Sequence, residues 1–135
     1  FMNLIITAGG TRERIDAVKT ITNESTGRLG SLIAEEFLRR FALQSHTIYY
    51  ICGVGSIIPD AEDPNIHIIR IEGTDQLQQE MSKLLRGQRI SAVIHSMAVS
   101  DYRIKCVTTP EAIARDVIQR NSYFSRSTNI LRREL

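Results

Sequence analysis

The sequence predicts an α/β fold: an open, Rossmann-like, mostly parallel sheet that is flanked by helices in three layers. Short apolar runs rich in β-branched residues alternate with segments whose apolar residues recur at helical spacing. The composition agrees, because 135 residues with 42% hydrophobic and 24% charged side chains are typical of one globular domain. We therefore expect a single α/β domain over residues 1–135, which is incomplete or lacks disordered segments toward its C-terminal side, at about residues 103–135.

The first half of the chain is predicted to form three strands and one long helix. Residues 3–8 are an apolar run that ends in two glycines, which indicates a buried strand followed by a tight turn. Residues 25–43 carry apolar side chains at helical spacing and predict an amphipathic helix. Two further β-branched runs predict strands at residues 46–52 and 66–71.

A second helix and a fourth strand complete the predicted sheet. The helix is expected to begin with Thr74 as its N-cap and to end with Gly87 as its C-cap, and the strand covers residues 90–97. Right-handed crossovers then place the fourth strand beside the first. Open parallel sheets bind ligands at such a switch point, so the predicted site lies where residues 9–11 and 97–101 meet.

The C-terminal part of the chain is basic. Residues 1–102 have a charge balance of −2, whereas residues 103–135 have 7 basic and 3 acidic side chains, a balance of +4. Thr109 and Pro110 have the N-cap and N1 signature of a third helix, and residues 121–135 allow no element to be predicted. The charge runs are short and favour a solvated helix, or a lid over an anionic substrate, so we expect no nucleic-acid partner.

Several classes of protein are disfavoured by the sequence. Cys52 and Cys106 cannot form a disulfide scaffold, and no zinc-ligand spacing is present. His46, His67 and His95 fall on separate predicted strands, which favours ordinary strand positions over a metal cluster. No apolar run approaches the length of a membrane span, so we expect a cytoplasmic protein without a membrane partner.

Two glycine-containing segments are candidate phosphate sites. Residues 8–11, Ala-Gly-Gly-Thr, would let the backbone approach a phosphate closely, although a tight strand-to-helix turn explains them equally well. They match neither G-x-G-x-x-G nor the P-loop pattern, which disfavours a nicotinamide oxidoreductase. Residues 23–30 place an Asn, two hydroxyls and two glycines where the first long helix begins, and free amides there suit a phosphate. The alternative is that Ser25 or Thr26 simply caps that helix.

The end of the fourth predicted strand contributes a third candidate segment. Ala98 would admit a flat base or a pantetheine arm close to the backbone. Asp101 would bond a ribose or hold a magnesium ion, and its alternative role is to cap a turn or helix.

Together these segments resemble the phosphopantothenate–cysteine ligase family. Residues 8–16 (AGGTRERID), 21–30 (ITNESTGRLG) and 97–102 (MAVSDY) match its signatures in order, spacing and predicted setting, over about residues 3–102. The resemblance implies an open α/β sheet and a homodimer. It also implies a ligase of coenzyme A biosynthesis that joins 4′-phosphopantothenate to cysteine through an acyl-nucleotide intermediate. The expected co-substrate is CTP, or else ATP, with Mg²⁺.

The resemblance also implies roles for individual residues. Asn23 is the expected catalytic residue, which contacts the acyl-nucleotide intermediate. The residues implied to bind phosphopantothenate are Gly9, Ser25, Gly27 and Gly30. The residues implied to bind the nucleotide are Gly10, Thr11, Met97, Ala98 and Asp101, and no residue is expected to be a metal ligand.

The sequence departs from the family toward its C-terminal side. The lysine-bearing lid and the Gly-Phe and Ala-Asn-Asp segments are absent, and the surroundings of Lys105 do not match those of the lid lysine. The alternative hypothesis is therefore a non-catalytic nucleotide- or cofactor-binding α/β module that has lost the lid.

Overall fold

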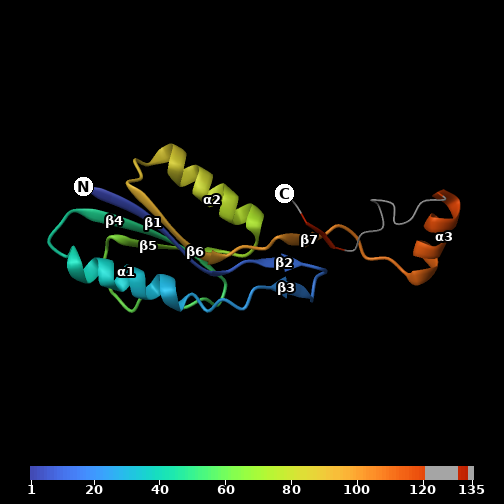
Figure 1. The fold of residues 1–135 in the computed structure, drawn as a ribbon. Coiled ribbons are helices and arrows are strands. Elements are labelled where there is room, and N and C mark those ends of the chain that lie inside the picture. Colours follow the sequence, from blue (N-terminus) through green and yellow to red (C-terminus); the bar gives the residue numbers. More distant parts are fainter. Residues whose placement is uncertain (121–130, 134–135) are drawn as a thin grey trace. The chain divides into compact units, whose positions relative to one another are not determined.

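The computed structural model describes residues 1–120 and 131–133 (Figure 1). Its internal contacts divide the chain into two compact units, so the expectation of a single domain stays a prediction. The first unit comprises Phe1–Arg12 and Ile21–Ser100, and the second comprises Glu13–Thr20 and Asp101–Leu135.

The first unit is built on a four-stranded parallel sheet with the strand order β5-β4-β1-β6. β1 therefore lies between β4 and β6, which confirms the prediction that the chain crosses back to place the fourth long strand beside the first. All four strands lie close to their predicted positions: β1 (Met2–Gly10), β4 (His46–Gly53), β5 (Ile66–Ile71) and β6 (Ala92–Ala98).

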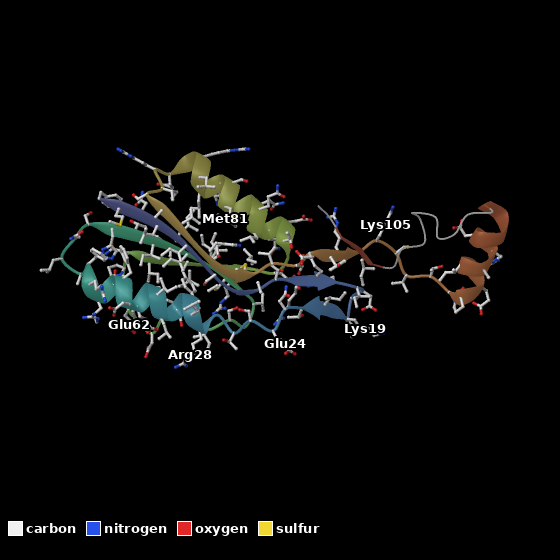
Figure 2. All side chains as sticks on the ribbon, in the orientation of Figure 1. Lys19, Glu24, Arg28, Glu62, Met81 and Lys105 are labelled. Carbon is white, nitrogen blue, oxygen red and sulfur yellow. The ribbon has the colours of Figure 1, made fainter. Side chains whose placement is uncertain are left out.

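Helices cover both faces of this sheet, as the three-layer prediction requires (Figure 1). α1 (Arg28–Arg40) packs on the face that carries Ile6, and α2 (Thr74–Gly87) packs on the face that carries Ile5. The alternation arises because successive side chains of a strand point to opposite faces. Figure 2 shows Met81 on the side of α2 that faces the sheet, where it packs against the second of these clusters.

Two predicted helix caps are wrong, and the cap considered as an alternative for α1 is not found. α1 begins at Arg28, and its N-cap is Gly27 rather than Ser25 or Thr26, because Gly27 adopts a left-handed φ of 81° that ends the preceding extended segment. The N-cap of α2 is Gly73, so Thr74 is already helical. Gly87 is the last residue of α2, and the C-cap is Gln88, whose amide bonds to the carbonyl of Leu84.

The long connection after β1 contains a hairpin that the sequence did not predict. β2 (Arg12–Arg14) and β3 (Thr20–Thr22) form a two-stranded sheet. At the turn, Oδ1 of Asp16 accepts hydrogen bonds of 2.7 Å from the amides of Val18 and Lys19. These two bonds favour the ionised carboxylate and lower the pKa of Asp16.

The second unit contains the third helix and a second small sheet. α3 (Pro110–Arg120) begins as predicted: the Oγ1 of Thr109 accepts a bond of 3.2 Å from the amide of Ala112, which confirms Thr109 as the N-cap. β7 (Tyr102–Ile104) pairs antiparallel with β8 (Leu131–Arg133), and neither strand was predicted. The rest of the stretch 121–135 lies outside the described residues.

Candidate functional site

The carboxyl ends of β1 and β6 meet at the predicted switch point. Gly9 pairs with Met97 and Gly10 pairs with Ala98 in the sheet register. The ladder continues past the strands, because the amide of Thr11 donates to the carbonyl of Ala98 at 3.0 Å. The two loops that the sequence placed at one crevice therefore lie side by side.

Thr11 and Ser100 tie these two loops together with their side chains. Thr11 is fully buried, and its hydroxyl lies 2.7 Å from the hydroxyl of Ser100. The same Thr11 oxygen accepts a bond of 2.8 Å from the Ser100 amide. The Thr11 side chain thus holds the fold of the crevice, and its predicted contact with a nucleotide stays a prediction. Ser100 was not among the predicted site residues.

Asn23 lies against the same pair of loops. Its Nδ2 donates to the Ala98 carbonyl and to the Ser100 hydroxyl, each at 3.3 Å. Its amide donates to the carbonyl of Thr11, also at 3.3 Å. A Cβ on Gly10 would lie 2.5 Å from the carbonyl oxygen of Asn23, so glycine at position 10 is what lets Asn23 approach β1. The structure therefore brings Asn23 together with three of the predicted nucleotide residues.

Gly9 and Gly27 lie together at the start of α1. Both have a φ of 81°, a backbone conformation that glycine adopts without strain. A Cβ on Gly27 would lie 3.3 Å from the amide nitrogen of Gly9 and 3.1 Å from the Cβ of Ser56. Two of the predicted phosphopantothenate residues are thus neighbours across the β1–α1 entrance.

Three other predicted site residues, Gly30, Ser25 and Asp101, do not lie with Gly9 and Gly27 in these contacts. A Cβ on Gly30 would lie 2.5 Å from the Cβ of Ala8, so this glycine allows α1 to pack closely on β1. Ser25 is half-buried in the segment before α1. Asp101 is exposed and belongs to the second unit, and its role stays a prediction.

The loop after β4 supplies site residues that sequence reasoning missed. A Cβ on Gly53 would overlap the carbonyl oxygen of Gly10, so this glycine lets the end of β4 press against the β1 turn. Arg12 donates from its guanidinium to the carbonyl of Val54 at 3.0 Å, and its amide donates to Glu72. The run of residues 53–56, Gly-Val-Gly-Ser, was the available signal.

His95 and Cys52, two ionisable side chains of the sheet, both have structural surroundings. Nδ1 of His95 lies 2.7 Å from the hydroxyl of Thr7, across the β1–β6 pair. Cys52 is fully buried, and burial raises the pKa of its thiol. Among the described residues, no group of three His, Cys, Asp or Glu side chains is arranged to hold a metal ion. None of the described helices has the length and apolar character needed to cross a membrane.

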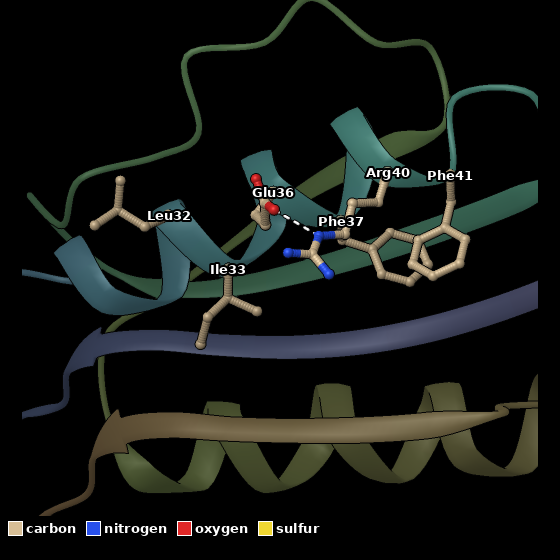
Figure 3. Close-up of a pocket in the computed structure, with 6 residues that line it drawn as sticks. All are labelled: Leu32, Ile33, Glu36, Phe37, Arg40 and Phe41. Carbon is tan, nitrogen blue, oxygen red and sulfur yellow. Dashed lines mark hydrogen bonds and ion pairs between the residues drawn. The ribbon is translucent and has the colours of Figure 1, made fainter.

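A cavity of about 380 Å³ lies elsewhere, along α1 (Figure 3). Its lining is apolar apart from Glu36 and Arg40, which form an ion pair. Arg39 and Arg40 both bond the carboxylate and lower the pKa of Glu36 to about 2. Because these residues lie in the middle and at the C-terminal end of α1, this cavity is separate from the strand-end crevice.

A parallel sheet with the order β5-β4-β1-β6, covered by helices on both faces and with glycines at the switch point between β1 and β6, defines a Rossmann-like α/β fold. The chain belongs to the family described as the DNA/pantothenate metabolism flavoprotein C-terminal domain, which it matches over residues 2–133. This membership confirms the resemblance that the three sequence segments carry.

Curated and structural relatives agree with this assignment. The chain is 32% identical over 102 residues to the coenzyme A biosynthesis bifunctional protein CoaBC of Thermococcus kodakarensis, covering 76% of this chain and 23% of that protein. It is similar to the solved DNA/pantothenate metabolism flavoprotein from Streptococcus pneumoniae, with 34% identity, a TM-score of 0.71, and coverage of 90% of this chain and 54% of that one. A mutant of Cab2 in complex with phosphopantothenate-cysteine shares the fold, with 17% identity, a TM-score of 0.65, and coverage of 82% and 51%. The chain thus spans about a quarter of the length of the curated relatives.

Proposed function

We propose that this chain acts in the ligation of 4′-phosphopantothenate to cysteine in coenzyme A biosynthesis. The observation that carries the proposal is the position of Asn23, whose side-chain amide is held at the strand-end crevice by β6. Family membership supports it, as do the names of the relatives, which are coenzyme A biosynthesis proteins.

The proposed reaction has two steps. The carboxylate of 4′-phosphopantothenate attacks the α-phosphorus of a nucleoside triphosphate, and pyrophosphate leaves. The amine of cysteine then attacks the carbonyl of the acyl-nucleotide and loses a proton, the nucleoside monophosphate leaves, and the amide forms. Negative charge develops on the carbonyl oxygen during the second step, and a preorganised donor there lowers the barrier.

Asn23 is the proposed donor. Both bonds of its Nδ2 are 3.3 Å long, at the outer limit for N–H···O hydrogen bonds. Exchanging one of them for a shorter bond to a charged oxygen is favourable, because charge-assisted bonds are the stronger ones. The Ala98 carbonyl keeps its bond from the Thr11 amide during such an exchange, so no buried acceptor is left without a donor.

The entrance to α1 is the proposed phosphate site. The N-cap Gly27 has no side chain to bond the first-turn amides, and the helix dipole adds partial positive charge at this end. A phosphate of either substrate, the monoester of phosphopantothenate or the nucleotide triphosphate, suits this position.

CTP is the proposed nucleotide, with ATP as the other candidate. Mg²⁺ is proposed to enter with the nucleotide, bound mainly by its phosphates, because the described residues present no cluster of three metal-ligating side chains. The chain itself is proposed to bind and orient the two substrates. We further propose a homodimer that works in the cytoplasm.

Product formation tests the proposal directly. Incubation of the protein with 4′-phosphopantothenate, cysteine, Mg²⁺ and either CTP or ATP is expected to release pyrophosphate and to form phosphopantothenoylcysteine. Absence of both products with either nucleotide would refute the ligase. Binding of CTP without turnover would instead support the non-catalytic binding module.

A further inference from the structure

Ser56 occupies a fixed position beside the entrance of α1. Its amide donates to the carbonyl of Gly53 at 3.1 Å, which closes the turn after β4. The amide of the next residue, Ile57, donates to the carbonyl of Thr26 at 2.9 Å, and the Tyr50 hydroxyl donates to the Ile57 carbonyl at 3.1 Å. These bonds join the loop to the segment that leads into α1, so the Ser56 side chain cannot move away independently.

Ser56 is largely buried, with 8% of the residue exposed, and its hydroxyl has no hydrogen-bond partner among the described residues. Most polar side chains buried to this extent are hydrogen-bonded to a protein group or to water. By contrast, Ser31 of the same region is 3% exposed, and its hydroxyl donates to the Arg28 carbonyl at 2.9 Å. The donor of Ser56 is therefore available to a ligand, whereas that of Ser31 is already used.

The Ser56 side chain lies against both left-handed glycines, and its hydroxyl oxygen lies against Gly9. A Cβ on Gly9 would overlap the Oγ of Ser56, so this oxygen fills the space that a side chain at position 9 would take. A Cβ on Gly27 would lie 3.1 Å from the Cβ of Ser56. The Ser56 hydroxyl thus sits between the β1 turn and the N-cap of α1.

The start of α1 supplies further donors at the same place. The amide of Arg28 has only a long bond of 3.4 Å, to the Oγ1 of Thr26. The amides of Leu29 and Gly30 have no acceptor within the helix, because the first four amides of any α-helix lack one. Figure 2 shows Arg28 at this end of α1, where its guanidinium adds positive charge.

We propose that the hydroxyl of Ser56 donates a hydrogen bond to a phosphate group bound at the N-terminus of α1. The inference deepens the proposed function, on which it rests, by adding a phosphate-binding residue from the β4 loop. The phosphate belongs either to the monoester of 4′-phosphopantothenate or to the triphosphate of the nucleotide, and the experiment separates the two.

Calorimetric titration of the whole chain and two serine variants tests this. Ser56→Ala is expected to weaken binding of 4′-phosphopantothenate or of CTP by about 10- to 100-fold, the range for one bond to a charged group. Pantothenate, which lacks the phosphate, is expected to bind both proteins equally. Ser31→Ala is the matched control, since its hydroxyl already has a protein partner, and it is expected to leave every affinity unchanged.

Thermal melts of the same samples serve as the control for correct folding of each variant. Ser56→Ala removes no protein hydrogen bond, so its Tm is expected to stay close to that of the wild type. Ser56→Cys is a second variant in case alanine leaves a packing defect, because it keeps the shape of the side chain but is only a weak donor. It is expected to lose affinity for the same ligand as the alanine variant.

The possible outcomes separate a failure of the Ser56 inference from a failure of the proposed ligase function. Unchanged affinity of both Ser56 variants for phosphopantothenate and for CTP would overturn the inference and leave the ligase proposal standing. A loss confined to one ligand supports the inference and assigns the phosphate to that ligand. If the wild type binds inorganic phosphate in a Ser56-dependent way but binds neither substrate, the site stands and the proposed function fails.

Discussion

Replacing Asn23 by alanine separates chemistry from structure at a single residue. In the active protein, we expect Asn23→Ala to lower turnover by about 10²–10³, the range for losing one preorganised oxyanion donor. The variant also loses two structural bonds, from Nδ2 to the Ala98 carbonyl and to the Ser100 hydroxyl, each 3.3 Å long. Turnover and stability are therefore both expected to fall, and the size of each loss shows whether Asn23 has a catalytic or a structural role.

The structural part of the loss follows from those two bonds. Each contributes a net 0.5–1.5 kcal/mol in typical cases, and bonds of this length lie in the lower half of that range, so about 1–2 kcal/mol is expected in total. For a chain of this size, that corresponds to a fall in Tm of about 4–7 °C. A purely structural role would produce this fall with little change in turnover of the remaining folded protein.

Asn3→Ala is the matched control. Asn3 lies at the opposite end of β1, is 7% exposed, and donates from Nδ2 to the carbonyl of Arg89 at 3.1 Å. Its loss is expected to lower Tm by a similar amount and to leave kcat and KM unchanged. Pyrophosphate release and thermal melts, measured on the same samples, give both quantities. Near-normal turnover of Asn23→Ala together with a lower Tm would assign the residue to the fold and remove the central group of the proposed mechanism.

Three further predictions concern stability and reactivity. Gly53→Ala is expected to destabilise the protein severely, because the new Cβ would overlap the backbone carbonyl of Gly10. Gly87→Ala meets nothing within 4 Å and should raise the free energy of unfolding by about 0.5–1 kcal/mol. Urea unfolding that finds Gly53→Ala as stable as Gly87→Ala would contradict this packing. Glu36 has its pKa lowered from 4.5 to about 2, so its stabilising contribution is present above pH 4.5 and is lost as the pH falls toward 2. Glu36→Gln should therefore lose less stability than the wild type over that interval, by a small amount because the group is exposed, and identical urea midpoints across it would argue against the ion pair. Cys52 should resist alkylation in the folded protein and react on unfolding, since it is fully buried with a raised pKa; mass spectrometry of labelled peptides would detect early modification if this is wrong.

The sheet and its order were predictable because they rest on long apolar runs. Residues 66–71 form β5 as predicted, and β1 extends its predicted run by only one residue before and two after. The hairpin of β2 and β3 was missed because three-residue strands with charged or exposed side chains have no period that distinguishes them from loop. Short strands are decided by pairing rather than by local pattern.

The candidate site was predicted in part for a similar reason. The glycines of β1 and Ala98 were found because they end strong strands that the topology brings together. Ser100 was missed because a lone serine in a loop carries no signal until the fold shows which group lies opposite it. Ser56 was missed because its only signal, the glycine-containing run at residues 53–56, follows a strand that was not expected to reach the site. The hydroxyl cap that was the alternative for α1 is not found, because the N-cap position is held by Gly27, whose φ of 81° favours glycine.

The candidate site has two groups of contacts, one at the start of α1 and one between the ends of β1 and β6. The residues of the second group lie much farther apart along the chain, which affects the order in which the two groups form during folding. Gly9, Gly27 and Ser56 all come from the first β–α–β segment, so the proposed phosphate site can form once that segment is complete. The bonds of Asn23 and Thr11 to Ala98 and Ser100 span 75 to 89 residues. Such distant contacts close late, because the loop entropy is lost before the contact forms. During synthesis, the nascent chain would thus acquire the proposed phosphate site before it can position the side-chain amide of Asn23.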